Sequence, residues 1–125
     1  MSKSSNQKTK LLHLARMLLR QTDEDHPLAV AQIIEALARQ DIKAERKSIY
    51  DDMEALRLFG LDVQCRKGKS PGWFVGDRDF ELPEVKLLMD AVQSSRFITQ
   101  KKSDALIRKL EGLASSHQAG QLQRQ

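Results

Sequence analysis

The chain has 125 residues, of which 40% are hydrophobic and 30% charged, and its formal net charge is +4. These values predict one compact domain with a modest core and room for an appendage, and they exclude a chain that is disordered throughout. The single cysteine excludes an internal disulfide. The chain lacks the ~20-residue apolar run of a membrane span, and its N-terminus lacks the apolar stretch of a signal peptide. We therefore expect a cytoplasmic protein.

Three helical patterns follow a polar start at residues 1–8. Leucine and alanine recur at helical spacing over residues 9–21, and a second pattern covers residues 30–38 beyond a break at Pro27. The third covers residues 43–59 and ends at Gly60, a residue type that tolerates the left-handed conformation found just after helices. Its apolar face contains Ile49, Met53 and Leu56.

Two short strands are expected next, at residues 61–66 and 72–75. The loop between them, KGKSPG, is rich in lysine and glycine and predicts a β-hairpin with a basic tip. Because side chains alternate along a strand, we expect one of Trp73 and Phe74 to face the core and the other to be more exposed. We interpret Cys65 as a small packed residue of the first strand, since no Cys/His pattern suggests a nucleophile.

The helical period returns after Phe80. One helix is expected from about Pro83, and another runs over residues 100–114 with Thr99 as its N-cap. Their expected apolar stripes are Val85, Leu88 and Val92 on the first helix, and Leu106, Leu110 and Leu113 on the second. Residues 115–125 form a polar tail with no clear stripe that would face a core.

The order of elements predicts a mainly α fold with a small β-hairpin: a winged helix-turn-helix at residues 1–80, a helical hairpin at 81–114 and a polar tail at 115–125. The helical hairpin leaves apolar side chains to be covered, namely Leu87, Met89, Ile98 or Ile107. We therefore expect residues 81–114 to form a homodimer. The alternative is a monomer in which this hairpin folds back on the winged helix.

The surface of the third helix carries the strongest functional signal. A helical wheel points Lys47, Tyr50 and Asp51 away from the apolar face, with Arg46 and Ser48 beside them. In a helix-turn-helix this face enters the major groove of DNA, where basic groups reach phosphates or guanine. Asp51 would either accept a hydrogen bond from a cytosine amino group or repel the DNA backbone. Asp52 lies closer to the buried side, so we expect it to hold a basic group or a backbone donor.

The wing would add a second contact through the basic cluster at its tip. The expected partner is therefore double-stranded DNA, and the candidate residues are Lys43, Arg46, Lys47, Ser48, Tyr50, Asp51, Arg66, Lys67, Lys69 and Ser70. Two alternatives remain open: a solvated charged face, and a protein-interaction module that does not bind DNA. The histidines lack ligand spacing and no catalytic pattern or phosphate-binding glycine loop is visible, so we expect no metal, cofactor or enzymatic activity.

The chain also resembles a known family. The stretches ERKSIYDDMEALRLFGLDV and GWFVGDRDFELPEVKLLMDAVQSSRFITQKKSDALIRKL are similar to the N-terminal part of the WYL-domain bacterial transcriptional regulators, and the resemblance extends from Leu11 to Leu113. It implies a DNA-binding winged helix-turn-helix, with Arg46, Lys47, Ser48 and Tyr50 on the reading helix and residues 67–70 at the wing tip. Position 51, often basic in that family, is Asp here. The WYL domain itself is absent from these 125 residues, and the sequence leaves open whether they are a natural short form or an excised piece.

Overall fold

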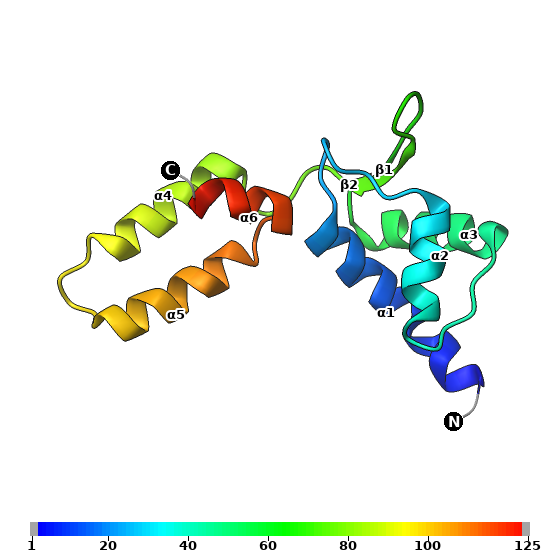
Figure 1. Cartoon of the computed structure of the whole chain (residues 1–125), viewed down its shortest axis with the longest axis horizontal. Coiled ribbons are helices and arrows are strands. Elements are labelled where there is room, and N and C mark those ends of the chain that lie inside the picture. Colours follow the sequence, from blue (N-terminus) through cyan, green and yellow to red (C-terminus); the bar gives the residue numbers. More distant parts are fainter. Residues whose placement is uncertain (1–2, 124–125) are drawn as a thin grey trace. The chain divides into compact units, whose positions relative to one another are not determined.

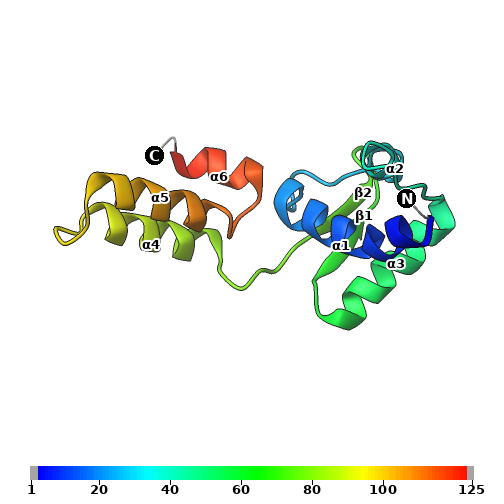
Figure 2. The same cartoon turned by 90° about the horizontal axis from the view of Figure 1, so that it is seen from below.

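The computed structural model describes residues 3–123 and confirms a mainly α fold with a small β-hairpin (Figures 1 and 2). The elements over these residues are α1 (Lys3–Gln21), α2 (Val30–Ala38), α3 (Arg46–Phe59), β1 (Val63–Arg66), β2 (Gly72–Val75), α4 (Leu82–Gln93), α5 (Gln100–Glu111) and α6 (Ser116–Gln123). They form two compact units, Met1–Gly76 and Asp77–Gln125, so the boundary lies four residues before the predicted one.

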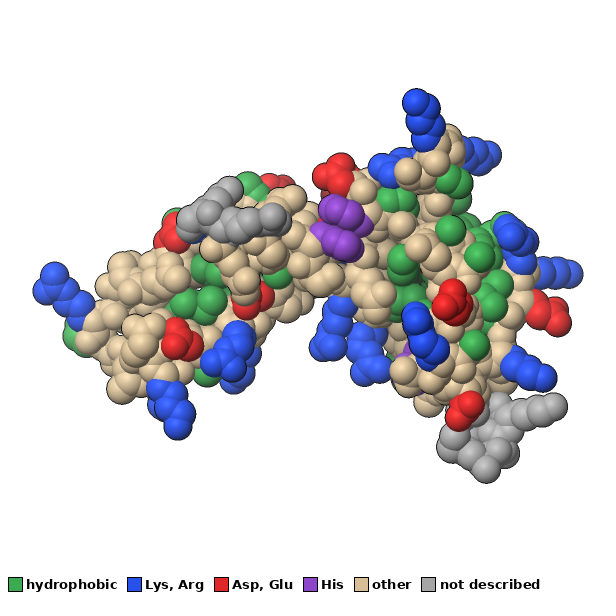
Figure 3. Space-filling model, in the orientation of Figure 1, with side chains coloured by type: hydrophobic (Ala, Val, Ile, Leu, Met, Phe, Trp, Pro, Cys, Tyr) green, Lys and Arg blue, Asp and Glu red, His purple; other side chains and the backbone are tan. Residues whose placement is uncertain are grey.

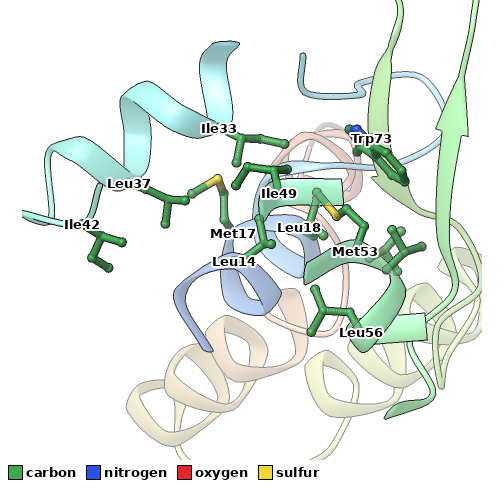
Figure 4. Packing of buried hydrophobic residues seen from close by; sticks show 12 residues of the cluster. Leu14, Met17, Leu18, Ile33, Leu37, Ile42, Ile49, Met53, Leu56 and Trp73 are labelled. Carbon is green, nitrogen blue, oxygen red and sulfur yellow. The ribbon is translucent and has the colours of Figure 1, made fainter. Parts of the chain in front are cut away.

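The core of the N-terminal unit lies where α1, α2, α3 and the hairpin meet (Figure 4). All three apolar residues predicted for the third helix are buried in it, which confirms the helical phase. The labelled side chains in Figure 4 converge from α1, from α2 and the turn that follows it, from α3 and from β2. This packing fixes the rotation of α3 about its axis and therefore decides which of its side chains point outward.

The β-hairpin is anchored to the loop between α1 and α2. Strands β1 and β2 pair antiparallel, with Val63 opposite Val75 and Arg66 opposite Gly72. On the other edge of β2, Leu28 N donates to Trp73 O at 2.9 Å and Trp73 N donates to Leu28 O at 2.8 Å. Only glycine fits at position 72, because a Cβ there would lie 2.6 Å from the Leu28 carbonyl oxygen.

Three expectations for this unit need correction. Helix α1 begins at Lys3, so the polar residues before Thr9 continue the helix. Trp73 and Phe74 are both buried, at 8% and 6% exposure, because β2 is enclosed between β1 and Leu28 and packs on α1. Cys65 is exposed, although Val63, two residues earlier on the same strand, is buried.

The C-terminal unit contains α4, α5 and α6. Thr99 is the N-cap of α5 as predicted, since its hydroxyl accepts from Lys102 N at 3.2 Å. The predicted polar tail instead contains α6, whose Leu122 is buried with Val85 and Met89. The start of α6 is held by reciprocal bonds: Gln118 N donates to Ser115 Oγ at 3.1 Å, and Ser115 N donates to Gln118 Oε1 at 3.2 Å.

The apolar face of the C-terminal unit agrees only in part with the predicted one: Val85, Leu110 and Leu113 pack inside the unit as expected. Met89 and Ile107 pack inside the unit rather than remaining uncovered, while Leu88 and Leu106 are exposed. The buried positions on α4 are 85 and 89, one helical turn apart, and α6 covers them. Leu87 is exposed as predicted, whereas Leu88 and Leu106, which were expected on the packed stripes, are exposed as well. No helix among the described residues is long and apolar enough to cross a membrane.

Candidate nucleic-acid interface

The outward face of α3 carries the side chains that the helical wheel placed there. Lys47 and Asp51 are exposed and Tyr50 is 41% exposed, while Ile49 and Met53 of the same helix are buried. The turn that leads into α3 is tied to α1, since Gln7 Nε2 donates to the Lys43 carbonyl at 3.0 Å. The core and this turn together hold the first two turns of α3 in a fixed orientation.

Tyr50 is held between the start of α3 and the hairpin. Its ring lies 5.9 Å from the Trp73 ring, centroid to centroid, with the planes tilted by 44°. Its hydroxyl accepts a long hydrogen bond from Arg46 Nη1 at 3.4 Å. Tilted aromatic pairs at this distance are favourable, so the phenol group has a preferred position on the surface and Arg46 is drawn toward it.

Asp52 forms an ion pair, as expected, and its partner is Lys10 of α1. Lys10 Nζ lies 2.7 Å from Asp52 Oδ2 and donates to Ser48 Oγ at 2.7 Å. Lys10 is buried and Ser48 half-buried. The contact turns the Ser48 hydroxyl toward α1, so this candidate residue joins the supporting structure rather than the outward face. Lys10 was missed in the sequence, although it lies one turn before the buried Leu14 on the same stripe.

Arg57 is a second supporting residue that the sequence analysis missed. Its guanidinium lies 5.5 Å from the centre of the Trp73 ring, and its Nε donates to Val63 O at 2.7 Å. It also pairs with Glu54, which reduces the negative charge that Glu54 presents on the outward face. The i, i+3 spacing of these two residues was the available signal. Arg57 thus connects the end of α3 to both strands of the hairpin.

The wing contains one anchored arginine and two exposed lysines. Arg66 donates through Nη1 to Glu24 O at 2.6 Å and through Nε to Ser70 O at 3.4 Å, so its guanidinium bridges the wing loop and the α1–α2 loop. Lys67 and Lys69 are exposed on either side of Gly68, whose φ is +118°. Figure 3 shows Lys and Arg side chains at the end of this hairpin loop. Ser70 is exposed beside them.

The exposed charges around the start of α3 and on the wing are mostly positive. Lys43, Arg46, Lys47, Lys67 and Lys69 are exposed cations, whereas Glu45 and Asp51 are the exposed carboxylates of the first turns of α3 and its N-cap. Such a surface attracts a polyanion, and an acidic residue within it opposes purely non-specific attraction. Among the described residues, no group of three or more His, Cys, Asp or Glu side chains could hold a metal ion.

No family model matches the chain, and searches of curated proteins and of solved structures also gave no match.

Proposed function

We propose that the N-terminal unit binds double-stranded DNA in a sequence-specific manner, with the outward face of α3 in the major groove and the wing on the adjacent groove or backbone. The observation that carries the proposal is that one core fixes both a helix with exposed Arg46, Lys47 and Tyr50 and a hairpin with exposed Lys67 and Lys69. A winged helix presents its reading helix and wing tip to DNA in this way.

The residues divide into two roles under this proposal. Lys43, Arg46, Lys47, Lys67 and Lys69 contact phosphates or base edges, with Tyr50 beside them as a hydrogen-bonding group. Ser48 and Arg66 hold α3 and the wing in position through their contacts with Lys10 and Glu24. Asp51 lowers affinity for phosphates and favours a base that offers an amino group.

The resemblance to WYL-domain regulators supports a role as the DNA-binding module of a bacterial transcription regulator. We further propose that the C-terminal unit joins two copies of the chain, because Leu87 and Phe97 are exposed by 69% and 99%, and Leu88 and Leu106 are also exposed. A dimer would present two reading helices to two half-sites, separated by about one turn of DNA or a multiple of it.

Removal of three proposed contacts tests DNA binding. The triple variant Arg46→Ala, Lys47→Ala, Lys67→Ala should bind random duplex at least tenfold more weakly than the wild type in a low-salt anisotropy titration. The matched control removes three exposed cations from the C-terminal unit, through Lys101→Ala, Lys102→Ala and Lys109→Ala. Equal affinities for the wild type and the first variant would refute the proposed surface, and so would an equal loss in the control.

A protein-interaction module is the second candidate, and one observation favours it. Leu58 and Phe59, at the end of α3, are 90% and 84% exposed, a pair of large apolar side chains suited to a protein partner. Salt separates the two candidates, because phosphate contacts weaken steeply as salt rises whereas an apolar contact does not. A wild-type chain that binds no duplex even at low salt would favour the protein-interaction module, whereas duplex binding that weakens steeply as salt rises would favour DNA.

A further inference from the structure

A hollow with a basic lining lies between α1 and α2. Its volume is about 270 Å³. Its base comes from Met17, Ala36 and Leu37, of which Ala36 is half-buried and the other two are buried. The remaining lining residues are all basic or amide side chains, namely His13, Arg16, Arg20, Gln21, Arg39 and Gln40. No carboxylate side chain is among the lining residues.

The three guanidinium groups are not neutralised by strong ion pairs with described carboxylates. Arg39 lies 4.0 Å from Glu35, and both side chains are at least 70% exposed, so this contact is weak. Arg16 Nη2 lies 3.3 Å from His13 Nδ1, a ring nitrogen rather than a carboxylate oxygen. The positive charge of the hollow therefore remains to be balanced by solvent ions or by a ligand.

Helix ends account for part of this arrangement. Arg20 lies in the last turn of α1 and Arg39 is the C-cap of α2, where a cation interacts favourably with the helix dipole. That effect explains one basic residue at each end. It does not explain why Arg16 and His13, more than a turn before Gln21, line the same hollow.

The hollow is separate from the proposed DNA-binding surface. Another cavity, of about 450 Å³, adjoins the start of α3 and is lined on α2 by Ile34 and Ala38. The basic hollow is lined by Ala36, which projects from the opposite flank of α2, by Gln40 in the turn after that helix, and by no residue of α3. A duplex seated on α3 would therefore leave this hollow open.

We propose that this hollow binds a small phosphomonoester. A guanidinium fork matches the oxygens of phosphate, and three of them from two helices suit the several oxygens of a phosphate better than the two of a carboxylate. The half-buried Ala36 would contact the uncharged part of the ligand, and the amides of Gln21 and Gln40 could bond to its hydroxyl groups. The volume accommodates one phosphate and a ring-sized body. This inference is independent of the DNA-binding proposal.

The test uses three probes: phenyl phosphate, inorganic phosphate and benzoate. Each is titrated into the full chain, and binding is followed by calorimetry and by NMR shifts of the arginine Nε and histidine ring signals. Phenyl phosphate should bind at least threefold more tightly than inorganic phosphate and at least tenfold more tightly than benzoate. Its shifts should concentrate on His13, Arg16, Arg20 and Arg39. Equal binding of phenyl phosphate and benzoate, or shifts spread evenly over the basic residues of the chain, would overturn the proposal.

Variants provide the second arm. Arg16→Gln with Arg20→Gln should weaken phenyl phosphate binding at least tenfold and leave the helical circular dichroism signal unchanged, because both side chains are exposed. Lys101→Gln with Lys102→Gln removes the same charge from α5 and should change affinity by less than twofold. An equal loss of phenyl phosphate affinity in both double variants would show a net-charge effect. Displacement of phenyl phosphate by duplex DNA would show that the hollow belongs to the DNA-binding surface. Either result refutes a separate phosphomonoester site.

Discussion

The two units of the chain differ in how completely they bury their apolar side chains. Among the described residues, the N-terminal unit gathers twelve buried side chains into one cluster, whereas the corresponding cluster of the C-terminal unit has three. The helices of the C-terminal unit expose Leu87 and Leu106, and the loop between α4 and α5 exposes Phe97. The N-terminal unit thus has a core sufficient to fix a charged surface, although Leu12, Leu58 and Phe59 are exposed in this unit too.

Under the proposed function, this difference assigns DNA binding to one unit and association to the other. A well-fixed core lets a few charged residues be held at defined positions, which recognition of a polyanion requires. An under-covered helical unit is suited to association, because burial of its exposed side chains stabilises the assembly. The comparison predicts that stability, assembly and ligand binding respond to different substitutions.

The largest expected effect is on the stability of the N-terminal unit. Leu18→Ala removes a fully buried side chain and should lower its free energy of unfolding by about 3 kcal/mol. Val85→Ala in the C-terminal unit should leave that value unchanged. Trp73 is the only tryptophan of the sequence and lies in the N-terminal core, so its fluorescence during urea unfolding reports this unit selectively. A fluorescence midpoint shifted equally by both substitutions would contradict the independence of the two cores.

A smaller loss is expected when the support of α3 is broken. Lys10→Met leaves Asp52 partly buried without its partner and should destabilise the N-terminal unit by about 2 kcal/mol, less than for a fully enclosed pair because Asp52 is 22% exposed. Lys8→Met makes the same chemical change on an exposed position of α1 and should have little effect. If the two variants unfold at the same urea concentration, the ion pair does not support α3.

The smallest effect on folding is expected at the exposed leucines of the C-terminal unit. Substitution of these leucines should instead change the molecular mass of the particle in solution. Leu87→Asp with Leu106→Asp should convert a dimer to a monomer in light scattering while the circular dichroism spectrum stays the same. Leu12→Asp places the same charge on an exposed leucine of α1 and should leave the dimer intact. A monomeric wild type at micromolar concentration would refute the dimer directly.

The sequence predicted elements well where their own periodicity was strong. The phase of α3, the hairpin and the Thr99 cap follow from local patterns, and the structure confirms them. Helix α6 was missed because eight mostly polar residues bury a single leucine, although Ser115 and Gln118 have the spacing of a capping box. The local signal was present but the apolar stripe was not.

Contacts between distant segments could not be predicted in the same way. The pair of Lys10 with Asp52 spans α1 and α3, and the bond of Arg66 to Glu24 spans the wing and the α1–α2 loop. Both depend on tertiary packing that no local pattern encodes. For this reason Ser48 and Arg66, selected as DNA contacts by their position in the sequence, are also supporting residues in the structure.

The most direct test of the proposed DNA-binding surface is the salt dependence of the affinity of the full chain for a short random duplex. Five exposed cations surround the start of α3 and the wing tip. Each phosphate contact contributes roughly −0.9 to the slope of log affinity against log salt, so five contacts should give a slope of about −4.5 per bound chain. The variant with Arg46, Lys47 and Lys67 replaced by alanine should flatten the slope by about 3. A wild-type slope near zero, or no binding at low salt, would contradict the proposed surface.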